Sequence, residues 1–199
     1  MDGAFGIWAA AAPARAHLMA DYAAADSWAT DAHKWLNVPY DCGIVFVKDQ
    51  APLRAAMSAT AAYLVKGGDG NRDNDEFTPE LSRRARGVEV WAALRCLGRQ
   101  GLAELVERCC LLAQRFADQL KAGGCEILND VGLNQVLVRF GDDDHTRATI
   151  TRIQEEGTCW AGGTTWHGKA AMRISVSSWQ TTEEDVDVSV RAMLKAGGK

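Results

Sequence analysis

Residues 26–47 read DSWATDAHKWLNVPYDCGIVFV, and this stretch is the most informative part of the chain. It places Lys34 between a histidine and a tryptophan, in an apolar neighbourhood that leads through a proline into an apolar run at 44–47. A lysine is costly to bury unless it has a use, and burial lowers the pKa of its amine, which can then form a Schiff base with a carbonyl group. The pattern therefore marks Lys34 as a candidate for covalent catalysis. The alternative is a solvated loop, in which the lysine stem lies over the indole and the ammonium stays in water.

A second motif, DGAFG at residues 2–6, lies upstream of the lysine stretch. Together with the run DAHKWLNVPYDCGIVFV at 31–47, it resembles the group II pyridoxal-phosphate-dependent decarboxylases, which include the aromatic-L-amino-acid, histidine and glutamate decarboxylases. The resemblance continues through Arg83-Arg84 to 172–176 and so covers nearly the whole chain. It implies an α/β fold of the fold type I, aspartate-aminotransferase-like class, present as a partial large domain followed by a small C-terminal α+β domain.

The resemblance also implies the roles of individual residues. Lys34 would carry pyridoxal 5'-phosphate as an internal aldimine, and Asp2 would pair with the pyridine nitrogen, unless Asp2 is a surface residue at the chain terminus. Ala4 would pack flat against the ring. His33 would touch the phosphate or orient the aldimine, unless it is only a hydrogen-bonded histidine beside the site. The predicted catalytic residue is therefore Lys34, and the predicted cofactor-binding residues are Asp2, Ala4, His33 and Lys34. A further hydroxyl donor to the phosphate would come from Thr30 or Ser27.

The reaction implied by the resemblance is decarboxylation of an L-amino acid. Relatives that decarboxylate carry, in a flexible loop ahead of the Arg-Arg segment, a tyrosine thought to protonate the carbanion. Residues 64–79 contain no tyrosine here, and Asn74 stands near its position. Two alternatives stay open: other chemistry on the same cofactor, namely transamination or oxidative deamination to an aldehyde, or an inactive remnant or dimerisation module. Because the motif at 2–6 ends a central strand in the family, the chain is expected to be the C-terminal portion of a longer enzyme.

Three regions follow along the chain: 1–60 as the C-terminal part of the cofactor-binding large domain, 61–122 as a mobile loop with connecting helices, and 123–199 as the small C-terminal domain. Short strands that alternate with helices in the first region predict a parallel sheet, with a buried strand at 43–47. Such sheets bind ligands at the carboxyl ends of their strands, so Asp2 and Lys34 would converge on one crevice. By resemblance, the glycine-rich loop 66–76 would close over the substrate.

Apolar residues at three- and four-residue steps predict a structural helix across 102–120, which Gly123-Gly124 would end. The patterns in the last region predict four more elements: a strand at 136–140, a helix at 146–156 ended by Gly157, a half-buried strand at 171–176, and a last helix with an N-cap signature at Thr182 and Asp185.

Composition agrees with an enzyme domain. With 199 residues, 47% of them hydrophobic, the chain can bury a sizeable core. A net charge of −4 argues against a nucleic-acid partner, and no apolar run is long enough to predict a membrane span. The six cysteines form no C-x-x-C pair, so the sequence predicts no metal site and favours reduced thiols in a cytoplasmic protein. By resemblance, the partners are an amino-acid substrate and a second copy of the chain in a homodimer.

Overall fold

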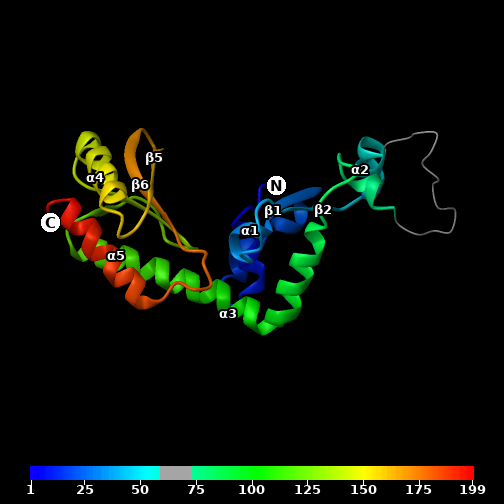
Figure 1. The fold of residues 1–199 in the computed structure, drawn as a ribbon, viewed down its shortest axis with the longest axis horizontal. Helices are drawn as coiled ribbons and strands as arrows, with labels where there is room; N and C mark the ends of the chain where they lie inside the picture. Colours follow the sequence, from blue (N-terminus) through cyan, green and yellow to red (C-terminus); the bar gives the residue numbers. More distant parts are fainter. Residues whose placement is uncertain (59–72) are drawn as a thin grey trace.

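The structure, a computed structural model, describes residues 1–58 and 73–199. Figure 1 shows one lobe built from the first part of the chain and another built from the last part, with a long bent helix, α3 (Arg86–Ala122), contributing to both. The predicted loop 66–76 lies mostly outside the described residues. Its end forms the start of a short 3-10 helix, η4 (Asn74–Phe77).

The first lobe contains short helices and a pair of strands. Its elements are, in order, η1 (Gly6–Ala11), η2 (Ala16–Met19), η3 (Tyr22–Ala24), β1 (Ser27–Asp31), α1 (Ala32–Trp35), β2 (Gly43–Val47) and α2 (Gln50–Met57). β1 and β2 pair antiparallel, so the parallel sheet predicted for this region is wrong for these two strands. Their connection holds only the four-residue α1 and a turn, which is shorter than a parallel crossover needs. A parallel bridge is made by the N-terminus, where Asp2 lies beside Ala29 of β1.

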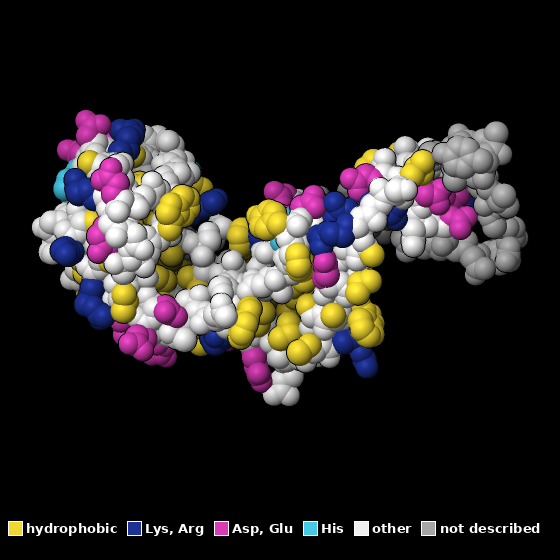
Figure 2. Space-filling model, viewed as in Figure 1, with side chains coloured by type: hydrophobic (Ala, Val, Ile, Leu, Met, Phe, Trp, Pro, Cys, Tyr) yellow, Lys and Arg dark blue, Asp and Glu magenta, His cyan; other side chains and the backbone are white. Residues whose placement is uncertain are grey.

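The strand predicted at 43–47 is present as β2, but its predicted burial is wrong. Val45 and Phe46 are about half exposed, and Val88 and Trp91 on the first half of α3 are 62% and 64% exposed. The apolar composition of β2 suits a covered strand, yet no segment among residues 1–58 and 73–199 buries these side chains. Figure 2 shows hydrophobic side chains gathered on this part of the surface.

α3 is kinked at Gly98, where φ is 62° and ψ is −174°. Glycine adopts positive φ without a steric penalty, which explains a sharp bend at this residue. Beyond the kink, one face of the helix is buried, at Leu105, Val106, Cys109, Cys110, Leu112, Ala113, Phe116, Ala117 and Leu120. The stripe predicted across 102–120 is thereby confirmed, and the helix ends at Gly123 as expected.

The last lobe is a four-stranded antiparallel sheet with two helices of its own. Its elements are β3 (Glu126–Ile127), β4 (Gln135–Arg139), α4 (Asp143–Glu156), β5 (Gly162–Trp166), β6 (Lys169–Ser175) and α5 (Glu183–Ala196), with strand order β3-β4-β6-β5. The four elements predicted here are confirmed. α4 starts three residues earlier than predicted, after Asp142, and Gly157 ends it at a φ of 80°. Thr182 and Asp185 form a full capping box on α5.

The hydrophobic core is continuous through both lobes. It runs from Trp8 and Trp35 in the first lobe, along the buried face of α3, to Val138 and Met193 in the second. The buried face of α3 thus belongs to one core with residues of both lobes. Of the helices that the structure describes, none is both long enough and apolar enough to cross a membrane.

Candidate active site

Lys34 lies on α1, between two residues that anchor the helix. Ala32 and Trp35 are fully buried, and the Trp35 indole N–H donates to the carbonyl oxygen of Phe5 at 3.1 Å. The Lys34 side chain is partly buried, with 29% of its surface exposed. Its Nζ lies 2.6 Å from an Asp31 carboxylate oxygen and 4.9 Å from the centroid of the Phe5 ring. The expectation of a lysine buried among apolar groups is therefore corrected: the ammonium is held by a carboxylate and by an aromatic face.

Asp2 lies beside the strand that leads to Lys34. Gly3 N–H donates to the Ala29 carbonyl at 2.7 Å, and Ala29 N–H donates to the Met1 carbonyl at 3.0 Å. The approach is so close that a Cβ on Gly3 would lie 3.1 Å from the Ala29 oxygen, which explains a glycine at this position. Asp2 Oδ1 accepts from Ala4 N–H at 3.0 Å, and the residue is exposed to solvent. The carboxylate is thus attached to β1 through its backbone and remains open to a ligand.

Thr30 has a structural task that the sequence did not reveal. Its hydroxyl donates to the Gly3 carbonyl at 2.9 Å and accepts from the Trp8 indole N–H at 2.8 Å, and the residue is 3% exposed. Both contacts of the hydroxyl are made in the interior, so Thr30 is not available as the phosphate donor that was expected from Thr30 or Ser27, and of the two only Ser27 is exposed. Instead, it ties the segment that carries Asp2 to β1.

His33 faces the turn after α1. Its Nδ1 accepts from the Cys42 backbone N–H at 3.1 Å, and its ring centroid lies 3.9 Å from that of Tyr40. Because Nδ1 accepts, a neutral ring carries its proton on Nε2, which is left as a donor. Cys42 itself is buried, and desolvation raises the pKa of its thiol, which makes the thiol a poor nucleophile.

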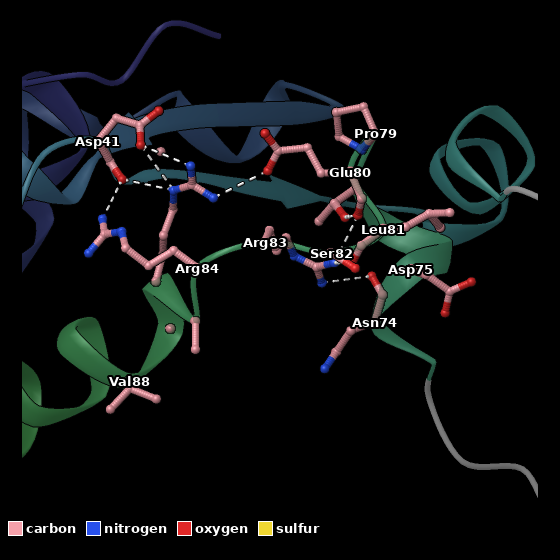
Figure 3. Close-up of a pocket in the computed structure, with 15 residues that line it drawn as sticks. Asp41, Asn74, Asp75, Pro79, Glu80, Leu81, Ser82, Arg83, Arg84 and Val88 are labelled. Carbon is pink, nitrogen blue, oxygen red and sulfur yellow. Dashed lines mark hydrogen bonds and ion pairs between the residues drawn. The ribbon is translucent and has the colours of Figure 1, made fainter.

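The arginine-rich segment 83–86 has a role that the sequence did not reveal. Arg84 donates to the Asp41 carbonyl at 2.9 Å, and Arg86 donates to the Asp41 carboxylate at 3.0 Å and to Glu80 at 3.2 Å. The hydrogen bonds from Arg86 lower the pKa of Asp41. Figure 3 shows Arg84 and Asp41 at one end of a groove and Asn74 and Arg83 towards the other. The arginines thus hold the turn that contains Asp41, next to Cys42, whose backbone N–H is bonded to His33.

The chemical groups of Asp2, Lys34 and His33 would suit pyridoxal phosphate. A carboxylate at Asp2, a primary amine at Lys34 and an imidazole N–H at His33 are the groups that its ring nitrogen, aldehyde and phosphate require. Two contacts join the segments that carry Asp2 and Lys34. Asp2 forms a β-bridge with Ala29 of β1, and the Lys34 amine lies over the ring of Phe5. Ala4 is half-buried next to Phe5 and adds no polar group.

The chain is similar to proteins of one known family over most of its length. Residues 1–140 match the pyridoxal-dependent decarboxylase conserved domain. The chain is 28% identical over 167 residues to the 3,4-dihydroxyphenylacetaldehyde synthase of Aedes aegypti, and 28% identical over 192 residues to the aromatic-L-amino-acid decarboxylase of Drosophila lebanonensis. These matches cover 82% and 95% of this chain but 32% and 48% of the two relatives. The chain therefore spans about half, or less, of the length of these curated relatives.

Among solved structures, the chain is similar to Oryza sativa TDC, which was crystallised with PLP and tryptamine. The TM-score is 0.91 at 22% identity, and the match covers 99% of this chain and 44% of that one. At this identity the likeness establishes the fold, and it confirms the predicted fold type I class.

Proposed function

The chain belongs to the pyridoxal-dependent decarboxylase family, and from that premise we propose that it supplies the lysine-bearing part of an enzyme that removes carbon dioxide from an L-amino acid. One observation carries the proposal. The Lys34 side chain is partly exposed, and its amine lies 2.6 Å from the Asp31 carboxylate. The amine also lies over the ring of Phe5, and Phe5 follows Asp2 by three residues in the sequence. When bound, pyridoxal phosphate supplies an electron-accepting ring for the electron pair released at the α-carbon.

Lys34 is the residue that we propose attaches the cofactor. To do so, its amine must lose a proton and leave Asp31, whose carboxylate lies at hydrogen-bond distance. Asp31 can therefore accept that proton, and it can hold the amine in place when no cofactor is attached. Phe5 limits the directions in which the ammonium can move, because its ring covers one side of it.

Asp2 and His33 are proposed to hold the two ends of the cofactor. The Asp2 carboxylate would accept a hydrogen bond from the ring nitrogen and keep it protonated, because an adjacent negative charge favours the charged form of a base. The Nε2 proton of His33 would be donated to a phosphate oxygen, while Nδ1 remains bonded to Cys42. Ala4 would leave room for a flat ring between these two contacts.

A second outcome at the same site is favoured by one observation. No tyrosine occurs in 64–79, and a relative that shares 28% of its residues over 167 positions is named as an aldehyde synthase. If the tyrosine is what directs protonation in the relatives, this chain has less control over where the proton goes. Analysis of the products as amine or aldehyde would separate decarboxylation from oxidative deamination.

We also propose that the enzyme is a cytoplasmic homodimer that takes an amino acid as substrate, with the three regions 1–60, 61–122 and 123–199 as its parts. All six cysteines are unpaired, which favours a reducing compartment. The exposed apolar side chains on β2 and the first half of α3 favour association with another protein surface.

The test is to map where the cofactor attaches. The protein is incubated with pyridoxal phosphate, reduced with borohydride, digested and analysed by mass spectrometry. We expect the label on Lys34, with the label lost in Lys34→Ala. Lys48 is the matched control, because it is an exposed lysine just after β2 and Lys48→Ala should leave labelling unchanged. Labelling of Lys48 at the same level as Lys34 would overturn the assignment. The same mapping on a chain extended by the upstream coding sequence tests whether residues from outside this stretch strengthen attachment.

A further inference from the structure

Asn37 joins the lysine turn to the C-terminal lobe. Its side-chain Nδ2 donates to the carbonyl of Lys34 at 2.6 Å and to the carbonyl of Ser177 at 2.9 Å. Its Oδ1 accepts from the backbone N–H of Trp179 at 2.9 Å. One side chain therefore connects the backbone of the proposed catalytic residue to two positions that lie about 140 residues away in the sequence.

The backbone at Asn37 is shaped for this contact. Its φ is 51°, in the left-handed region that few residues other than glycine enter, and asparagine is among the residues that tolerate it best. The left-handed turn directs the chain away from α1 and leaves the amide between the two lobes. Because the hydrogen bonds of the Asn37 side chain go to backbone groups of both segments, they hold the two segments in a fixed relative position.

The opposite side of the Ser177–Trp179 segment is anchored to α3. Arg108 donates to the carbonyl of Trp179 at 2.6 Å and to the carbonyl of Thr181 at 3.1 Å. The segment thus lies between α3 and the lysine turn and is bonded to both. It also leads from β6 to α5, so a movement of the C-terminal sheet must act on it directly.

We propose that Asn37 is a positioning residue that clasps the Lys34 turn to the Ser177–Trp179 segment and so couples the orientation of Lys34 to the position of the C-terminal lobe. Loss of the clasp removes the hydrogen bond to the Lys34 carbonyl, so the C-terminal end of the short helix α1 is held less firmly. The amine then samples more directions and meets the cofactor less often in the productive one. The part of the inference that concerns cofactor attachment rests on the proposed function of Lys34.

The experiment compares Asn37→Gly with Asn129→Ala. Glycine adopts the left-handed backbone without strain, so the substitution removes the side-chain hydrogen bonds without introducing a steric clash. Asn129 is the matched control, because its side chain also bonds three backbone groups, those of Asp130, Gln135 and Leu137, all within the C-terminal lobe. Two quantities are measured: amide hydrogen exchange of peptides spanning 34–38 and 177–181 in the cofactor-free protein, and the rate at which pyridoxal phosphate becomes trappable on Lys34 by borohydride.

In Asn37→Gly we expect exchange in both segments to rise about tenfold or more, because about three hydrogen bonds are lost, and trapping on Lys34 to slow. Asn129→Ala should raise exchange near Leu137 and leave both Lys34 readouts unchanged. Arg108→Ala, on an exposed side chain, releases the same segment from α3 and should raise exchange across 177–181 even if Asn37→Gly folds poorly.

Unchanged exchange at 34–38 in Asn37→Gly, or an equal effect of Asn129→Ala there, would overturn the clasp. Increased exchange without slower trapping would overturn the coupling to Lys34. If the wild-type protein carries no label on Lys34, it is the proposed function that fails, while the exchange measurement still decides the clasp.

Discussion

Replacing Thr30 with valine tests whether this residue holds the Asp2 segment against β1. Valine has nearly the same shape as threonine but cannot donate or accept a hydrogen bond. The substitution leaves the Trp8 indole N–H without its partner in the interior, where Thr30 is 3% exposed. The Gly3 carbonyl loses the bond from Thr30 but keeps a weaker one, from the Ile7 N–H at 3.4 Å.

The magnitude follows from these two losses. A buried donor left unpaired costs about 1–3 kcal/mol, and the half-satisfied carbonyl adds less, so we expect Thr30→Val to destabilise the fold by about 2–3 kcal/mol. For a chain of this size, that corresponds to a decrease in melting temperature of roughly 4–12 °C. Trapping of pyridoxal phosphate on Lys34 should also weaken, because the segment that carries Asp2 loses a tie to β1.

Thr30→Ser is the control, since it keeps the hydroxyl and removes one methyl group, at a cost of about 1 kcal/mol. Thermal unfolding followed by circular dichroism and borohydride trapping are measured on both variants. If Thr30→Val is no less stable than Thr30→Ser, the two hydrogen bonds do not contribute as argued. If stability falls and trapping is unaffected, Thr30 supports the fold without supporting the site.

Two further predictions concern the C-terminal lobe. Hydrogen bonds from Arg115 lower the pKa of Asp187 from 3.8 to about 2, so this pair stabilises the fold above about pH 4, and the contribution is lost as the pH falls towards about 2. Asp187→Asn should therefore reduce the loss of stability between about pH 4 and pH 2 in a curve of unfolding free energy against pH. An unchanged loss in this range would contradict the assignment. Gly197→Ala places a Cβ 2.7 Å from the fully buried ring of Phe140 and should lower the free energy of unfolding, measured in urea, by about 1–3 kcal/mol. Gly123→Ala brings its Cβ against the flexible side chain of Leu194 and should lower it by less. The reverse order would show that the ring moves more easily than the leucine.

The sequence by itself was enough to predict the family and most of the C-terminal lobe, and it marked Lys34 as the candidate catalytic residue. These features are local in the sequence. The apolar stripe at 102–120 and the glycine that ends it predict α3, and the capping residues Thr182 and Asp185 predict the start of α5. The motif around Lys34 is likewise continuous in the chain, and it was sufficient to predict the fold type I class that the similar solved structure confirms.

Tertiary structure decided how the parts around Lys34 are joined. A single sequence does not reveal that Thr30 would bond the Gly3 carbonyl, that Arg86 would bond Asp41, or that Asn37 would reach Trp179, because these partners are brought together only by folding. The antiparallel pairing of β1 with β2 was missed for the same reason. Strand alternation sets which face a side chain occupies, but the direction of pairing depends on the path of the connection in space.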